Sequence, residues 1–163
     1  MSAYLQATGT RVWSPSGQTP HLFVTPQRDH LHFYGALDVF TGQEFALALP
    51  QMNTEATLCF IHHLLECLPH RPILFLLDRA PWHKGLVRHF IEAHPDLDML
   101  YFPPGSPHLN PQEHVWKLTR QAVGHLHQWR DLAQLRQAFQ HFLENTRFHF
   151  NWIEKFLPAI LCI

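Results

Sequence analysis

The stretch Ile73-Leu-Phe-Leu-Leu77-Asp78 is the part of the sequence that decides the fold class. Five consecutive apolar residues between Pro72 and an aspartate are too few for a buried helix. They are typical of a strand that is covered on both faces of a parallel sheet. Open α/β sheets place ligands and catalytic groups at the carboxyl ends of such strands, where Asp78 stands. An aspartate here is also a common turn or helix-capping residue, so both interpretations of Asp78 stay open.

The segments around this strand alternate between strand and helix patterns. Upstream, strand-like segments at 3–6, 22–25, 31–38 and 45–49 indicate an antiparallel meander, and a helix follows from the N-cap Asn53 to Leu68. Downstream, the pattern predicts a helix at 84–94, a strand at 97–102, a helix that begins with Pro111, and an amphipathic helix at about 131–145. This order predicts an α/β fold with a mixed sheet.

The length and composition indicate a single domain. Of the 163 residues, 46% are hydrophobic and 15% are charged, which is enough apolar material for one core at roughly 100–200 residues per domain. The longest stretch without a charged residue, 12–27, has sixteen residues and three prolines, so it cannot span a bilayer. Cys59 and Cys67 lie too far apart on their expected helix to pair, and we expect buried reduced thiols. These features predict a soluble, cytoplasmic protein.

The charge balance gives no general signature of nucleic-acid binding. Twelve Lys and Arg residues stand against thirteen Asp and Glu, a net charge of −1. A nucleic-acid partner would therefore have to bind to a local cluster of basic residues. Arg79, Lys84 and Arg88 form one basic cluster, for which an ordinary exposed helix surface is the alternative explanation. The fifteen histidines show no zinc-binding spacing, and the sequence has no Gly-rich phosphate loop.

Glu113 follows the expected N-cap Asn110 by three residues. This spacing fits a capping box, in which the glutamate reaches back to the backbone N–H of the N-cap residue. It also places Glu113, Trp116, Lys117 and Arg120 on one helical face, where the acid would suit a metal ion and the cations would suit DNA phosphates. A solvated face explains the cations equally well. The buried stripe of the same helix is expected at Val115, Leu118, Ala122 and Leu126.

Two motifs resemble those of mariner-like insertion-sequence transposases of the DDE superfamily. They are Asp78-Arg-Ala-Pro-Trp-His83 and Phe102-Pro-Pro-Gly-Ser-Pro-His-Leu-Asn-Pro-Gln-Glu-His-Val-Trp116-Lys117. Residues 79–112, thirty-four positions, lie between Asp78 and Glu113, which is the separation of the second and third catalytic acids in that group. The segment Gly35-Ala-Leu-Asp-Val-Phe-Thr-Gly42 also resembles these enzymes, so the likeness covers nearly the whole chain.

The resemblance implies a ribonuclease-H-like α/β fold, in which helices flank a mixed five-stranded sheet. It makes Asp78 and Glu113 the catalytic acids of this chain and the ligands of Mg²⁺ or Mn²⁺, with two ions in the complete site. The implied activity of the full-length form is metal-dependent cleavage and transfer of DNA strands. Supporting roles fall to three further motif positions, His83, Asn110 and Trp116.

The partner that the resemblance implies is DNA, which means transposon ends in the full-length form. We expect the DNA contacts to come from Arg79, Lys84, Lys117 and Arg120. A second copy of the chain is a further candidate partner, and no membrane contact is expected. The sequences of the transposon ends and of the target, and the oligomeric state, are not specified by these motifs.

The chain departs from the family pattern at its start. An Asp-Glu pair is expected immediately before Ala3, where this sequence has Met1 and Ser2. We therefore expect residues 1–163 to be a single catalytic domain, truncated at its first strand, without a helix-turn-helix domain and inactive as given. A frameshift product, a truncated gene model and a remnant explain this start equally well.

Whether the chain is itself an enzyme therefore stays open. The alternative function is a catalytically dead ribonuclease-H-like module that binds DNA or associates with itself. Asp38, at the end of an expected strand, is a candidate substitute for the missing acid, although a turn residue before Thr41-Gly42 is the simpler interpretation.

Overall fold

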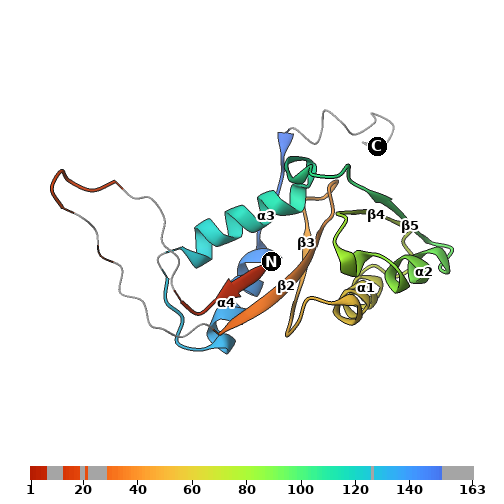
Figure 1. Ribbon diagram of the computed structural model, residues 1–163, viewed down its shortest axis with the longest axis horizontal. Helices are drawn as coiled ribbons and strands as arrows, with labels where there is room; N and C mark the ends of the chain where they lie inside the picture. The colour runs from red at the N-terminus through yellow and green to blue at the C-terminus, as the bar shows by residue number, and fades with distance from the viewer. Residues whose placement is uncertain (7–12, 19–20, 22–28, 126, 152–163) are drawn as a thin grey trace.

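The strands form two hydrogen-bonded ladders (Figure 1). The computed structural model describes residues 1–6, 13–18, 21, 29–125 and 127–151. The first ladder is antiparallel and consists of β1 (Ser2–Tyr4), β2 (His30–Leu37) and β3 (Glu44–Leu49). The second is parallel and consists of β4 (Ile73–Leu77) and β5 (Leu97–Tyr101). Antiparallel and parallel pairing with flanking helices confirms the expected α/β fold with five strands, although the described strands are hydrogen-bonded in two ladders and not in one mixed sheet.

The strand positions agree closely with the alternation of apolar residues in the sequence. The strands predicted at 31–38, 45–49 and 97–102 are each found within one residue at either end. The first strand, predicted at 3–6, is Ser2–Tyr4. The predicted segment 22–25 lies outside the described residues.

Four described α-helices accompany the strands: α1 (Thr54–Cys67), α2 (Leu86–Glu92), α3 (Pro111–Thr119) and α4 (Leu132–Asn145). Side-chain caps explain where the longest two begin. The side-chain oxygen Oδ1 of Asn53 accepts a hydrogen bond from the Ala56 N–H at 2.8 Å, and Oδ1 of Asp131 accepts one from the Gln134 N–H at 2.8 Å. In the described part of the chain, no helix is long and apolar enough to cross a membrane.

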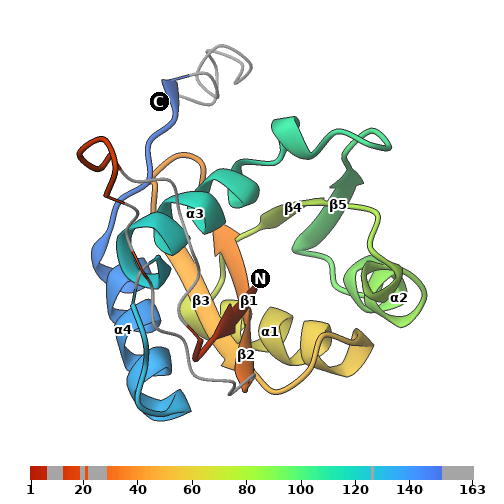
Figure 2. The same cartoon turned by 60° about the vertical axis from the view of Figure 1, so that its left-hand side comes forward.

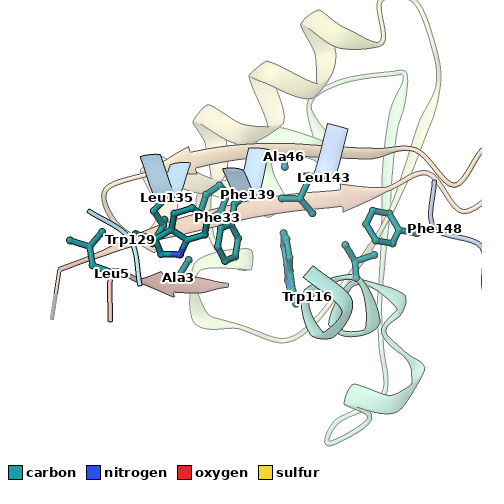
Figure 3. Packing of buried hydrophobic residues seen from close by; sticks show 11 residues of the cluster. Ala3, Leu5, Phe33, Ala46, Trp116, Trp129, Leu135, Phe139, Leu143 and Phe148 are labelled. Carbon is teal, nitrogen blue, oxygen red and sulfur yellow. The ribbon is translucent and has the colours of Figure 1, made fainter. Parts of the chain in front are cut away.

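The first ladder lies between α4 and α1 (Figure 2). It separates two hydrophobic clusters, one on each of its faces. Phe33 on β2 faces α4, where its ring stacks on Phe139 with centroids 5.4 Å apart (Figure 3). The next residue, Tyr34, faces α1, and its ring centroid lies 5.7 Å from that of Phe60. Because successive side chains of a strand point to opposite faces, β2 contributes to both cores.

The α3 helix is shorter than expected and buries a different face. It ends at Thr119 and continues as a π-helical turn over Arg120–Gly124. Of the expected buried stripe, Val115 is buried, Leu118 is 42% exposed, Ala122 is exposed, and Leu126 lies outside the described residues. The expectation is therefore right at Val115 and wrong at Leu118 and Ala122, and Trp116 is buried instead. The physical reason lies on β2, where Gly35 has no side chain and the indole of Trp116 occupies the space that a Cβ would need.

The second ladder is covered on one face. Phe75 of β4 is buried in the cluster that α1 and α2 complete, but Leu74 and Leu76 are 55% and 48% exposed. Leu100 of β5 shares their exposed face. The expectation of a strand buried on both faces is therefore wrong, because a run of apolar residues does not reveal which face of a strand receives a partner.

The cysteines on α1 are also more exposed than expected. Cys59 and Cys67 are free thiols, in agreement with the sequence, but both are exposed to solvent. The helix turns Phe60, Ile61 and Leu64 toward the core, and this buried face does not include the cysteines.

Candidate active site

Asp78 follows the last residue of β4 and lies at the carboxyl end of the parallel ladder. One of its oxygens, Oδ1, accepts a hydrogen bond from the backbone N–H of Ala80 at 3.0 Å. A 3-10 turn over Pro81–His83 then brings the His83 ring back toward the same oxygen, with Nδ1 2.8 Å from Oδ1. The spacing is that of an ion pair, although the ring N–H is not aligned on the oxygen as in a directed hydrogen bond.

These neighbours keep Asp78 ionised. The contact with His83 is the main cause that holds the pKa of Asp78 below its ordinary value, and the Ala80 N–H acts in the same direction. Partial burial opposes both, since it favours the neutral acid. His83 is itself anchored, because the Tyr101 hydroxyl donates a hydrogen bond to its carbonyl oxygen at 2.7 Å. A half-exposed carboxylate that is held in one orientation is suited to bind a cation.

Glu113 lies in the first turn of α3, which Asn110 caps. The Asn110 side chain accepts a hydrogen bond from the Gln112 N–H at 3.0 Å, as an N-cap residue does. The Asn110 N–H, however, donates to the carbonyl oxygen of Pro107 at 3.1 Å. A capping box would place Glu113 on that N–H, so this structural alternative is not realised. The Glu113 side chain is exposed instead.

Asp78 and Glu113 line one pocket of about 170 Å³. The loop 102–107 between β5 and α3 forms much of its wall, and Arg79 and Asn110 complete it. Because β4 and α3 are far apart in the sequence, only the tertiary fold brings the two acids to this pocket. Among the residues that the structure describes, no three His, Cys, Asp or Glu side chains converge as a metal-binding group. The pocket therefore offers two carboxylates to a cation rather than a complete protein cage.

The predicted DNA-binding cations have different relations to this pocket. Arg79 belongs to its wall, and its Nε donates a hydrogen bond to the carbonyl oxygen of Phe102 at 3.1 Å. Lys84 and Lys117 are exposed, the former directly after the Pro81–His83 turn and the latter one turn after Glu113 on α3.

Two motif positions have roles that the structure makes explicit. Asn110 caps α3 and also lines the pocket. Trp116 was expected on the polar face of α3, but it is 6% exposed and packs in the core between α3 and the first ladder (Figure 3). Its contribution is to the placement of the helix.

The start of β1 is joined to β2 through its α-amino group. The α-amino group of Met1 donates a hydrogen bond to the Phe33 carbonyl oxygen at 2.7 Å. Burial lowers the pKa of this amino group to about 6, while the charges of Glu113 and Asp78 act in the opposite direction. The charges of both acids of the pocket therefore act on the α-amino group at position 1.

Asp38 has a turn role. Its Oδ1 accepts hydrogen bonds from the backbone N–H groups of Phe40 and Thr41, at 2.9 and 3.2 Å. These contacts close the turn between β2 and β3, which is the simpler of the two interpretations of Asp38. Asp38 is not among the residues that line the pocket.

Sequence reasoning missed one acid next to this site. Glu44, the first residue of β3, is 2% exposed, and its Oε1 accepts a hydrogen bond from Gln112 Nε2 at 2.7 Å. Burial raises the pKa of Glu44 to about 8. The alternation of β3 held a signal, since Glu44 shares its sheet face with the buried Ala46.

Comparison with known families and proteins agrees with the fold. The family model described as DDE superfamily endonuclease matches residues 2–136. The uncharacterised protein y4pE/y4sA of Sinorhizobium fredii is 32% identical over 92 residues, which cover 55% of this chain and 64% of that protein. The uncharacterised 39 kDa protein of insertion element IS630 from Shigella sonnei is 25% identical over 139 residues, or 82% of this chain and 40% of that protein. The chain thus spans less than two thirds of either relative.

Solved structures of Mos1 transposase have a similar fold. In the paired-end complex with the left transposon end, the likeness has a TM-score of 0.67 at 15% identity and covers 90% of this chain and 46% of that one. The strand transfer complex gives 0.68 at 15% identity over 90% and 45% of the two chains. At this identity the likeness concerns the fold alone, and it confirms the ribonuclease-H-like fold expected from the sequence.

Proposed function

Because this chain belongs to the DDE superfamily of endonucleases, we propose that it is the catalytic domain of a DNA transposase of the mariner-like insertion-sequence group. The proposed activity of the full-length form is metal-dependent cleavage and transfer of DNA strands. One observation carries the proposal: Asp78 and Glu113 line the same pocket.

Asp78 and Glu113 are the residues that would hold Mg²⁺ or Mn²⁺. Mg²⁺ takes one or two protein carboxylates and completes its coordination with water and phosphate oxygens, so the two acids of the pocket fit it. When bound, a pair of such ions stabilises the attacking and leaving oxygens of an in-line displacement at phosphorus. The solved Mos1 complexes include one with Mn, which supports this choice of cation.

The surrounding residues prepare the acids for this task. His83 and the Ala80 N–H hold Asp78 in its charged form and in one orientation. The Asn110 cap fixes the first turn of α3 and thereby the backbone of Glu113. Arg79, at the wall of the pocket, is suited to neutralise a phosphate of the DNA backbone.

The wider DNA surface is assigned to Lys84, Lys117 and Arg120 together with Arg79. All four lie in or next to the two motifs that contain the acids. The Mos1 structures are complexes with transposon ends, and this supports DNA as the substrate class of this chain.

A polypeptide of residues 1–163 alone is proposed not to cleave DNA. The place of the first acid, immediately before Ala3, is occupied by Met1 and Ser2. A site for two ions would then lack one of the carboxylates that hold them. One observation favours the alternative of a catalytically dead module: in the described ranges no third ligand joins Asp78 and Glu113.

The test restores the acid. A variant with Met1→Asp and Ser2→Glu, made behind a new start codon, should nick supercoiled plasmid in the presence of Mn²⁺. Asp78→Ala or Glu113→Ala in that background should abolish nicking. Glu66→Ala, which removes an exposed acid of α1, is the matched control and should retain it.

Two results would change the proposal. Absence of nicking by the restored variant, with DNA binding retained, would support the dead module. Robust nicking by the unaltered chain that is lost on Asp38→Ala would show that Asp38 supplies the third acid.

A further inference from the structure

We propose that Glu44 is a positioning residue for the acid site, whose buried carboxyl ties the first turn of α3 to β3 and so determines where Glu113 lies. This inference rests on the proposed function, because the acid site is what Glu44 would serve. The tie between β3 and α3 is argued from the contacts of Glu44 alone.

The tie joins two distant parts of the chain at the base of the site. Gln112, the residue before Glu113, donates a hydrogen bond from Nε2 to Glu44 Oε1 at 2.7 Å. Sixty-eight positions separate the two residues in the sequence. Glu44 is 2% exposed, so little water competes for this bond. A buried side-chain bond of this kind resists displacement of the helix terminus.

Packing holds the Glu44 carboxyl in place. A Cβ at Gly35 would collide with Glu44 Oε1 and with the Trp116 ring, so these groups fill the space that the glycine leaves on β2. Trp116 lies one helical turn after Gln112 on the same side of α3. The helix is therefore held at two successive turns, by the Gln112–Glu44 bond and by Trp116 over Gly35.

The second oxygen of Glu44 indicates a function beyond packing. Oε2 is buried and has no hydrogen-bond partner among the described residues. Burial raises the pKa of Glu44 to about 8, against the opposing effects of the Gln112 hydrogen bond and of the α-amino group of Met1. A leucine here would avoid the cost of a buried acid but could not accept the hydrogen bond from Gln112.

Glu113 depends on this arrangement because no hydrogen bond of its own side chain is found among the described residues. The capping-box contact is not formed, and the side chain is exposed. The carboxylate therefore lies wherever the first turn of α3 places it. A shift of about 1 Å at a catalytic group is enough to weaken a metal site or a reaction strongly.

The experiment compares Glu44→Leu, Glu44→Gln and Gln112→Leu with the unaltered chain. Hydrogen exchange of the backbone amides of 113–116 reports on the helix turn, and Mn²⁺ affinity, measured by electron paramagnetic resonance, reports on the acids. Gln121→Leu is the matched control, because Gln121 is an exposed glutamine just beyond α3.

Glu44→Leu and Gln112→Leu should each speed exchange at 113–116 and weaken Mn²⁺ binding about tenfold. Glu44→Gln retains a side-chain oxygen for Gln112 and should rescue both readouts. Exchange at α4 should not change. If Glu44→Leu does not fold, Gln112→Leu tests the same bond from its other end.

The outcomes separate this inference from the proposed function. Unchanged exchange at 113–116 in both leucine variants would overturn the inference. Faster exchange with unchanged Mn²⁺ affinity would show a structural tie that does not serve the site, and would overturn it as well. If Asp78→Ala and Glu113→Ala leave Mn²⁺ affinity unchanged, the proposed function fails, and hydrogen exchange still decides whether Glu44 positions α3.

Discussion

The Nδ1 atom of His83 lies 2.8 Å from Oδ1 of Asp78, so the two ends of the motif 78–83 are in contact. The 3-10 turn over Pro81–His83 makes this contact possible, and the Tyr101 hydroxyl holds the backbone of His83 from the neighbouring strand. The motif is therefore a small folded unit that presents one carboxylate oxygen to two neighbours, His83 and the Ala80 N–H.

Replacement of His83 should raise the pKa of Asp78. The group has a depressed pKa in the folded protein, so its contribution to stability is present above the ordinary pKa and is lost as the pH falls through the folded value. In His83→Ala, the ¹³C titration of the Asp78 carboxyl should move toward the ordinary value of 3.8. His89→Ala, which removes an exposed histidine of α2, is the control. An unchanged Asp78 titration in His83→Ala would contradict the role of His83.

Glu44 should make stability depend on pH in the opposite sense. The folded protein holds this proton up to a pKa of about 8, whereas the ordinary value is 4.5. Stability is therefore lost as the pH rises from 4.5, because the unfolded chain releases a proton that the folded chain keeps. Glu44→Gln should remove this loss, which amounts to roughly 3 kcal/mol between pH 4.5 and pH 7 at about 1.4 kcal/mol per unit.

Urea unfolding of both proteins at a series of pH values measures this difference. The gap between Glu44→Gln and the unaltered chain should widen in favour of the variant as the pH rises from 5 to 7, a range below the folded pKa of about 8. A constant gap across this range would show that Glu44 ionises normally.

Gly35→Ala should destabilise the protein by about 3 kcal/mol, the upper part of the range for overpacked cores. The new methyl group would occupy the space of the Glu44 carboxyl and the Trp116 ring. Gly17→Ala is the control, because Gly17 has φ +84° and no atom of the described residues lies within 4 Å of its Cβ position, so its cost is backbone strain of about 1 kcal/mol. Equal losses in the two variants, measured by chemical unfolding, would argue against the close approach of Trp116.

Trp116→Ala should cost about 3–5 kcal/mol, as expected for removal of a buried aromatic side chain. Trp116 is 6% exposed and belongs to the core of the first ladder. Trp13, by contrast, is fully exposed, and Trp13→Ala should change stability by no more than about 0.5 kcal/mol. Thermal or chemical unfolding of the pair distinguishes the core role from an exposed motif role.

DNA binding should be weak, largely independent of sequence, and stronger at pH 6 than at pH 7.5. The chain has fifteen histidines, and protonation of histidine at pH 6 adds positive charge that favours DNA binding. Alanine variants of Arg79, Lys84, Lys117 and Arg120 should each lose a phosphate contact. Each should therefore reduce the slope of log K against log salt concentration by about one. Fluorescence anisotropy with a labelled duplex measures both effects.

Arg136→Ala is the control for these cations, because Arg136 is an exposed arginine of α4 and lies outside both motifs. If Arg136→Ala loses as much DNA affinity as Arg79→Ala, binding depends on the overall charge of the protein and not on a patch at the pocket. Tight binding to one duplex sequence at physiological salt would contradict the prediction.

Several features were determined by the sequence alone, because they depend on neighbours along the chain. The period of apolar residues located the strands and helices, since side-chain spacing is a property of one element. The Asn53, Asn110 and Asp131 caps are contacts over two or three residues. Asp78 at the end of β4 and Glu113 in the first turn of α3 followed from the same local rules.

Other features were decided only by the tertiary structure, because they depend on which element covers which face. Trp116 turned inward because Gly35, on another strand, leaves space for it. Leu74 and Leu76 stayed exposed because an apolar run does not specify a partner for both faces of a strand. Glu44 became a buried acid because Gln112 and Trp116 close over it from α3. Local patterns record the spacing of side chains, whereas burial and pKa depend on contacts between residues that are distant in the sequence.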